Sequence, residues 1–82
     1  MNEAHFAKIR GIAADLFQMG REQITAETSP AQIPAWDSVQ HLNLILSVEQ
    51  EFGLQFEPEE IDQVRSIGRL AALVTQKVGN SR

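Results

Sequence analysis

Residues 36–53, WDSVQHLNLILSVEQEFG, contain the clearest helix signal in this 82-residue chain, and they decide its fold. Asp37 is a favoured N-cap residue, and Gln40 follows three positions later, as in a capping box. Apolar residues then recur at three- and four-residue steps, which is the period of an amphipathic helix. Gly53 suits the left-handed conformation in which many helices end. We therefore expect a helix over residues 37–52, with Ser38 in its first turn.

This helix carries two apolar stripes rather than one. At about 100° per residue, the first is a natural core stripe, which consists of Leu44, Ile45, Val48 and Phe52. The second, which we name the docking stripe, consists of Val39, Leu42 and Leu46, with Glu49 near its edge. The wide apolar arc leaves two interpretations open. Either the helix is central and largely buried, or the docking stripe is a surface for partner proteins beside Ser38.

The flanking segments predict three further helices. Apolar residues from Phe6 to Phe17 favour a helix over about 3–19, for which Gly20 is a suitable end. A long loop that contains Pro30 and Pro34 follows over residues 21–35. A proline suits the first turn of a short helix over about 58–63, and a serine can cap a last helix over 66–78.

The resulting fold class is all-α, a small bundle of three longer helices and one short helix, with no convincing strand and no internal repeat. We expect a single domain over residues 1–82, in which Gly79 ends the last helix and residues 79–82 form a frayed tail.

Composition excludes several classes of protein. The chain has no cysteine, so it has no disulfide framework and no thiolate zinc site. Its net charge is −4, and no Lys or Arg lies between Glu22 and Val64, a balance that argues against nucleic acid and suits a basic partner surface. No apolar run reaches membrane-spanning length, and we expect a cytoplasmic monomer.

The sequence argues against a catalytic role for Ser38 and leaves two other interpretations. His41 follows three residues later, but a serine hydrolase also needs a group that holds the histidine, and no GxSxG elbow is present. The two histidines and the carboxylates show no metal-ligand spacing. Ser38 is thus an ordinary helix-start residue, or it is an attachment point. A phosphodiester there would lie at the positive end of the helix dipole.

The segment resembles the attachment segment of acyl carrier proteins, the phosphopantetheine-carrying domains. The matching residues are Asp37, Ser38, Leu42, Ile45, Glu49, Phe52 and Gly53. Residues 56–74, FEPEEIDQVRSIGRLAALV, are similar to the short third helix and the capped fourth helix of that family. The resemblance implies a four-helix bundle of acyl-carrier type that is not an enzyme. It also implies that Ser38 receives 4′-phosphopantetheine from coenzyme A through a phosphopantetheinyl transferase, with Asp37 as the cap beside it.

The same resemblance implies the roles of neighbouring residues. Acyl groups would be held as thioesters on the arm and delivered to acyl-loading and acyl-transferring enzymes. The expected partner-binding residues are Trp36, Val39, Leu42, Leu46 and Glu49. The candidates for an acyl pocket are His41, Leu44, Ile45, Val48 and Phe52.

The sequence also departs from the family pattern around the serine. Val39 replaces the usual Leu. Trp36 precedes the Asp, where it either packs the long loop or contacts a partner. His41 lies where an acyl pocket would open, either as a partly exposed, hydrogen-bonded side chain or as a residue that makes the pocket mouth polar. Neutral Gln40, Asn43 and Gln50 predict weaker attraction to basic partners than a fatty-acid carrier has.

The sequence leaves the pathway open. A carrier in fatty-acid-like, polyketide or other specialised biosynthesis is the leading interpretation. One alternative is an aminoacyl or peptidyl carrier that an adenylating enzyme loads. Another is a helical protein-interaction module that is never modified.

Overall fold

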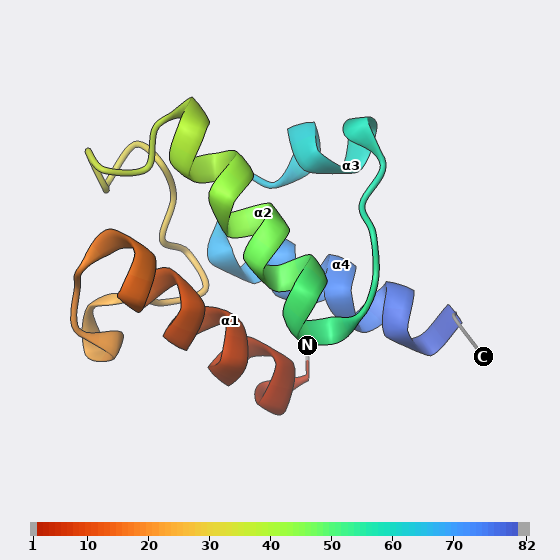
Figure 1. Ribbon diagram of the computed structural model, residues 1–82. Helices are drawn as coiled ribbons and strands as arrows, with labels where there is room; N and C mark the ends of the chain where they lie inside the picture. Colours follow the sequence, from red (N-terminus) through yellow and green to blue (C-terminus); the bar gives the residue numbers. More distant parts are fainter. Residues whose placement is uncertain (1, 81–82) are drawn as a thin grey trace.

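The computed structural model describes residues 2–80 and consists of helices joined by loops (Figure 1). The elements are α1 (Glu3–Phe17), a 3-10 turn η1 (Arg21–Gln23), α2 (Ser38–Phe52), α3 (Pro58–Gln63) and α4 (Ile67–Asn80). Across this described part of the chain there is no strand, so the all-α prediction with three long helices and one short helix is confirmed. Helix α1 packs against both α2 and α4.

One hydrophobic core joins the helices to the long loop. The helices bury residues at the predicted three- and four-residue steps, among them Ile9 and Phe17 of α1 and Leu70 of α4. The loop between α1 and α2 buries Ile24, Ile33 and Trp36 in the same core. These apolar anchors explain how a long loop keeps one conformation in a small domain.

Two predicted helix ends are wrong. Helix α1 stops at Phe17 rather than near residue 19, because Gln18 adopts the left-handed conformation with φ 56°. The Met19 amide then donates to the Ala14 carbonyl over 2.9 Å, which closes the last turn.

Helix α4 continues through Gly79 to Asn80, so the first two residues of the predicted frayed tail are helical. A glycine costs a helix only about 1 kcal/mol relative to alanine, and the preceding turns outweigh it. The remaining two residues of that tail, 81–82, lie outside the described residues.

The start of α2 confirms only half of the predicted capping box. The Asp37 carboxylate accepts from the Gln40 amide over 2.9 Å, as expected of an N-cap. The Gln40 side chain does not return to Asp37, because its Oε1 accepts from Asn43 Nδ2 over 2.8 Å and its Nε2 donates to the Leu16 carbonyl of α1 over 3.4 Å. At the other end Gly53 has φ 66°, and the predicted left-handed C-cap is confirmed.

The long loop also covers the start of α4. The amides of Ile67 and Gly68 donate to the carbonyls of Thr28 and Ala26, over 3.0 and 2.9 Å. A Cβ atom on Gly68 would lie 2.8 Å from the Ala26 oxygen, so only glycine allows this approach without a shift of the backbone. The loop therefore pairs amide groups that have no partner within the helix itself.

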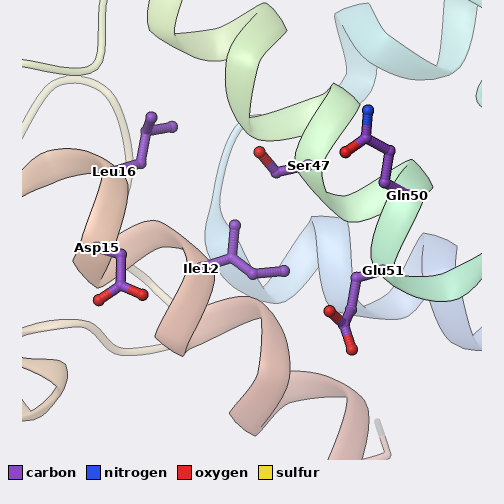
Figure 2. A pocket seen from close by; sticks show the side chains of 6 residues that line it. All are labelled: Ile12, Asp15, Leu16, Ser47, Gln50 and Glu51. Atoms are coloured by element: carbon purple, nitrogen blue, oxygen red, sulfur yellow. The ribbon is translucent and has the colours of Figure 1, made fainter.

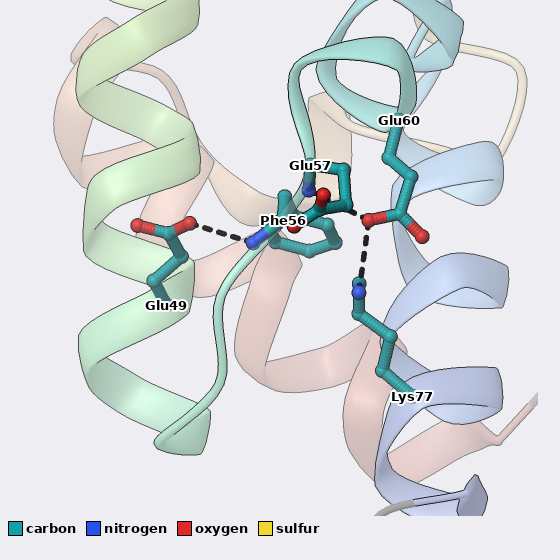
Figure 3. Close-up of polar contacts among 5 residues, drawn as sticks. All are labelled: Glu49, Phe56, Glu57, Glu60 and Lys77. Atoms are coloured by element: carbon teal, nitrogen blue, oxygen red, sulfur yellow. Dashed lines mark hydrogen bonds and ion pairs between the residues drawn. The ribbon is translucent and has the colours of Figure 1, made fainter.

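Helix α3 is held between α2 and α4 by polar contacts, which Figure 3 shows. The Glu49 carboxylate of α2 accepts from the Phe56 amide over 2.8 Å, just before α3. Glu60 Oε1 accepts from the Glu57 amide over 2.7 Å and from Lys77 Nζ of α4 over 2.8 Å. The hydrogen bond from Lys77, with that from the Glu57 amide, lowers the pKa of Glu60 below its ordinary value of 4.5.

Candidate functional site

Ser38 is the first residue of α2 and is exposed to solvent. Its neighbour Asp37 caps the helix, so the Ser38 hydroxyl is not needed as a cap. No residue among 2–80 forms a hydrogen bond with the Ser38 hydroxyl. The first amides of a helix concentrate partial positive charge at this end, which favours a phosphate group on the neighbouring oxygen.

A groove of about 550 Å³ opens beside Ser38 between the loop, α2 and α3. Its lining residues are Pro30, Trp36, Asp37, Ser38, His41, Leu42, Ile61 and Asp62. The sequence reasoning missed Pro30, Ile61 and Asp62. Ile61 and Asp62 are distant from Ser38 in sequence, and no motif signals that α3 lies opposite the start of α2. Pro30 lies in the preceding loop, whose path the sequence does not predict.

The docking stripe is exposed. The exposed fractions of Val39, Leu42 and Leu46 are 67%, 53% and 53%. In the part of the chain that the structure describes, these are the exposed large hydrophobic residues. The interpretation of α2 as a largely buried helix is therefore wrong for this stripe. Three aligned apolar side chains in solvent beside Ser38 are typical of a surface that partner proteins contact.

Trp36 belongs to the core, with an exposed fraction of 4%. Its indole ring stacks on Phe17 of α1, with ring centroids 5.4 Å apart, and on His41 of α2, at 6.0 Å. A buried ring offers almost no contact area, so the structure corrects the expectation that Trp36 binds a partner. The alternative use, packing of the long loop, is the one observed.

His41 is half-buried, with both ring nitrogens in contact with a hydrogen-bonding group. Trp36 Nε1 donates to His41 Nδ1 over 3.0 Å, and His41 Nε2 lies 3.0 Å from the carbonyl oxygen of Ile61 in α3. The expected hydrogen-bonded state of His41 is confirmed. The ring also borders the groove, and it thereby joins the loop, α2 and α3.

The other acyl-pocket candidates lie away from the groove. Leu44, Ile45 and Val48 are at most 2% exposed and face the core. Phe52 is half-buried at the far end of α2, where its ring meets His5 edge-on at 5.3 Å. None of these four lines the groove beside Ser38. Their role in holding an acyl chain stays a prediction.

All three acids on or beside α2 are already engaged within the protein. Glu51 pairs with Lys8 of α1 over 2.9 Å, and Glu49 accepts from the Phe56 amide. Asp37 is the cap. The docking stripe is therefore flanked by few free carboxylates, in agreement with the weak electrostatic attraction expected from the sequence.

A second groove, of about 460 Å³, lies between α1 and α2 (Figure 2). Its lining residues are Ile12, Asp15, Leu16, Ser47, Gln50 and Glu51, and Ser38 is not among them. No group of three or more metal-binding side chains occurs within residues 2–80. Among the same residues, no helix is both long and apolar enough to cross a membrane.

Comparison with known proteins identifies the family. A family model described as "Phosphopantetheine attachment site" matches residues 7–74, which is most of the chain. The chain belongs to this family of phosphopantetheine carriers. The resemblance drawn from residues 36–53 and 56–74 is thereby confirmed.

Similar proteins carry the name acyl carrier protein. One from Thermosynechococcus vestitus is 28% identical over 95% of this chain and 98% of its own length. One from Lactobacillus acidophilus is 27% identical over 94% of this chain and 96% of its own length. One from Coprothermobacter proteolyticus is 32% identical over 79% of each chain.

Membership in this family brings a covalently attached 4′-phosphopantetheine and a carrier role without catalysis of its own. The residues present fit such a group. An exposed serine at a helix N-terminus offers a reactive oxygen, and the adjoining groove leaves room beside it. The first amides of α2 supply partial positive charge beside the oxygen that would carry the phosphate.

Proposed function

We propose that Ser38 is the residue that carries 4′-phosphopantetheine, and that residues 1–82 act as a single acyl carrier domain. The observation that carries this proposal is the open start of α2. Ser38 is exposed there, Asp37 provides the cap, and the docking stripe begins at the next residue. A transferase can therefore reach the hydroxyl without unfolding any part of the helix.

The arm supplies a thiol on which an acyl group is held as a thioester. The protein's own residues supply the anchor and the recognition surface. Val39, Leu42 and Leu46 offer apolar contact to the phosphopantetheinyl transferase and to the enzymes that load and receive acyl groups. Because few carboxylates flank this stripe, apolar burial contributes more to docking than charge attraction does.

The neutral docking surface favours a carrier of fatty-acid-like, polyketide or other specialised biosynthesis over the main carrier of fatty-acid synthesis. Loading assays with acyl-transferring and with adenylating enzymes distinguish an acyl carrier from an aminoacyl carrier. A chain that is never modified would fail both assays.

The decisive experiment is intact-mass spectrometry after incubation with coenzyme A and a phosphopantetheinyl transferase. We expect wild type to gain the mass of one arm and Ser38→Ala to gain none. Ser47→Ala is the matched control, because Ser47 lies on the same helix beside the α1–α2 groove, and this variant should gain one arm at Ser38 as wild type does. A mass gain in Ser38→Ala, or none in wild type, would contradict the proposal.

A further inference from the structure

Trp36, His41 and the Ile61 carbonyl form a continuous hydrogen-bonded bridge. A carbonyl oxygen only accepts, so His41 Nε2 carries the proton and donates to Ile61 over 3.0 Å. His41 Nδ1 is then the acceptor that the Trp36 Nε1–H group requires, also over 3.0 Å. Both contacts are satisfied by a single neutral form of the ring. The bridge therefore connects the loop, α2 and α3 through the single side chain of His41.

This bridge lies where the groove beside Ser38 meets the core, since His41 and Ile61 line the groove and Trp36 is a core residue. His41 lies three residues after Ser38 and lines the groove, whereas Leu44, one turn further along α2, is fully buried. On its inner side Trp36 is backed by the stacked ring of Phe17. An apolar chain anchored at Ser38 that entered between α2 and α3 would meet the His41 ring before it reached Leu44.

Opening the bridge is unfavourable because its Trp36 end is shielded from water. Displacing His41 would leave the buried indole N–H group of Trp36 without an acceptor, whereas the Ile61 carbonyl would keep the Val64 amide as its donor. A buried polar group that loses its only partner costs more free energy than the bond itself contributed. A short acyl chain gains too little from burial to offset that loss, since the gain grows with each methylene group.

We propose that the Trp36–His41–Ile61 bridge is a closed latch that keeps the cargo of this carrier outside the core. The class of cargo it favours is a short acyl group, which rests in the groove outside the latch and loses nothing by staying there. This inference concerns the same site as the proposed function, and it rests on attachment at Ser38.

A chemical anchor tests the latch without any transferase. The chain has no cysteine, so Ser38→Cys introduces a unique thiol that N-butyl and N-dodecyl iodoacetamide will alkylate. Leu44 lies six residues along α2 from this thiol, about 9 Å of helical rise, within reach of the dodecyl chain. The side-chain methyl resonances of Leu44 and Ile45 and the fluorescence of Trp36, the single tryptophan, report on the core.

We expect the butyl and dodecyl forms of Ser38→Cys to share the same core methyl shifts and the same melting temperature. Adding His41→Leu removes the latch, and the dodecyl form should then shift the Leu44 methyls and melt about 4 °C or more above the butyl form. The matched control is His5→Leu, which alters the other histidine, on α1 against Phe52 and Thr75. It should leave the two forms alike.

A dodecyl chain that shifts the core methyls while His41 is present would overturn the latch. If the variant with His41→Leu does not fold, Trp36→Phe removes the indole donor and keeps an aromatic ring. In this variant the dodecyl form should also shift the core methyls and melt above the butyl form, by smaller amounts. If the two forms of Trp36→Phe do not differ, the latch is overturned as well. Because no enzyme attaches the chain, this outcome is independent of the mass-gain experiment, whose failure would instead refute attachment at Ser38.

Discussion

Helices α2 and α4 begin in opposite ways. Each start has a side-chain cap, since Asp37 accepts from the Gln40 amide and Ser66 Oγ accepts from the Arg69 amide over 3.1 Å. The first two amides of α4 are paired with loop carbonyls, and its start is covered. The start of α2 is open, with Asp37 and Ser38 both exposed.

The comparison explains why one serine suits modification and the other does not. The Ser66 hydroxyl is half-buried and is the cap of its helix, so a bulky group there would remove the cap and displace the loop. The Ser38 hydroxyl is spared that role by Asp37. Of these two helices, therefore, only α2 has both a free hydroxyl and uncovered amides at its start.

The covered start should be the most sensitive to a change of one methyl group. In Gly68→Ala the new Cβ would lie 2.8 Å from the Ala26 oxygen, a backbone atom that cannot rotate away. Overpacking of this kind costs about 1–3 kcal/mol, and we expect a loss of that size in the free energy of unfolding. Urea titration followed by circular dichroism measures it.

Gly79→Ala is the matched control near the other end of α4, where a new Cβ has nothing within 4 Å. It should stabilise the protein by up to about 1 kcal/mol, because alanine favours a helix more than glycine does. Equal effects at the two glycines would show that the loop does not hold the start of α4.

Substitution of Ser66 should lower stability without preventing modification, and substitution of Ser38 should prevent modification without lowering stability. Ser66→Ala removes a cap and should cost about 0.5–2 kcal/mol, yet the purified variant should still accept one arm at Ser38. Ser38→Ala removes no cap, so its unfolding free energy should stay within about 0.5 kcal/mol of wild type. The urea midpoint and the intact mass of each variant give both quantities. A large stability loss in Ser38→Ala would mean that its hydroxyl has a structural role.

The sequence predicted the parts of the fold that depend on neighbouring residues. Helix α2 has a favoured cap and a terminal glycine, and α3 has a proline in its first turn, so their bounds agree with expectation. The end of α1 escaped prediction because Gln18, a residue with no preference for positive φ, takes the left-handed conformation. The cover over α4 depends on contacts between residues about forty positions apart, such as Ala26 with Gly68.

The candidate site shows the same division. Asp37 was identified as the cap from local helix chemistry, whereas the attachment role proposed for Ser38 came from the resemblance of residues 36–53 to acyl carrier proteins. The sequence showed both stripes of α2, but only the packing of the other helices decides that the docking stripe is the one in solvent. The bridge from Trp36 through His41 to Ile61 spans three segments, and its spacing of five and then twenty residues matches no local motif.

Helix α3 begins in a third way, with a carboxylate in its first turn that pairs with α4. A change to this carboxylate should have the smallest effect on the free energy of unfolding, and that effect should depend on pH. Glu60 lies in its first turn, and its pKa is lowered by Lys77 and by the Glu57 amide. A lowered folded pKa means that the ionised group stabilises the fold fully above the unfolded value of about 4.5, and that this contribution disappears as the pH falls through the folded pKa.

The test compares wild type with Glu60→Gln, which keeps an acceptor for the Glu57 amide and removes the charge that pairs with Lys77. We expect a loss below about 1 kcal/mol at pH 7, because the pair is partly exposed, and the two proteins should converge in stability as the pH falls below 4.5. Urea unfolding at pH 7 and at pH values below 4.5 measures both differences. Glu59→Gln is the control, an exposed neighbour in the same turn, and its unfolding free energy at pH 7 should stay within about 0.5 kcal/mol of wild type. A difference for Glu60→Gln that grows as the pH falls would mean that the carboxylate destabilises α3, contrary to its contacts with Lys77 and the Glu57 amide.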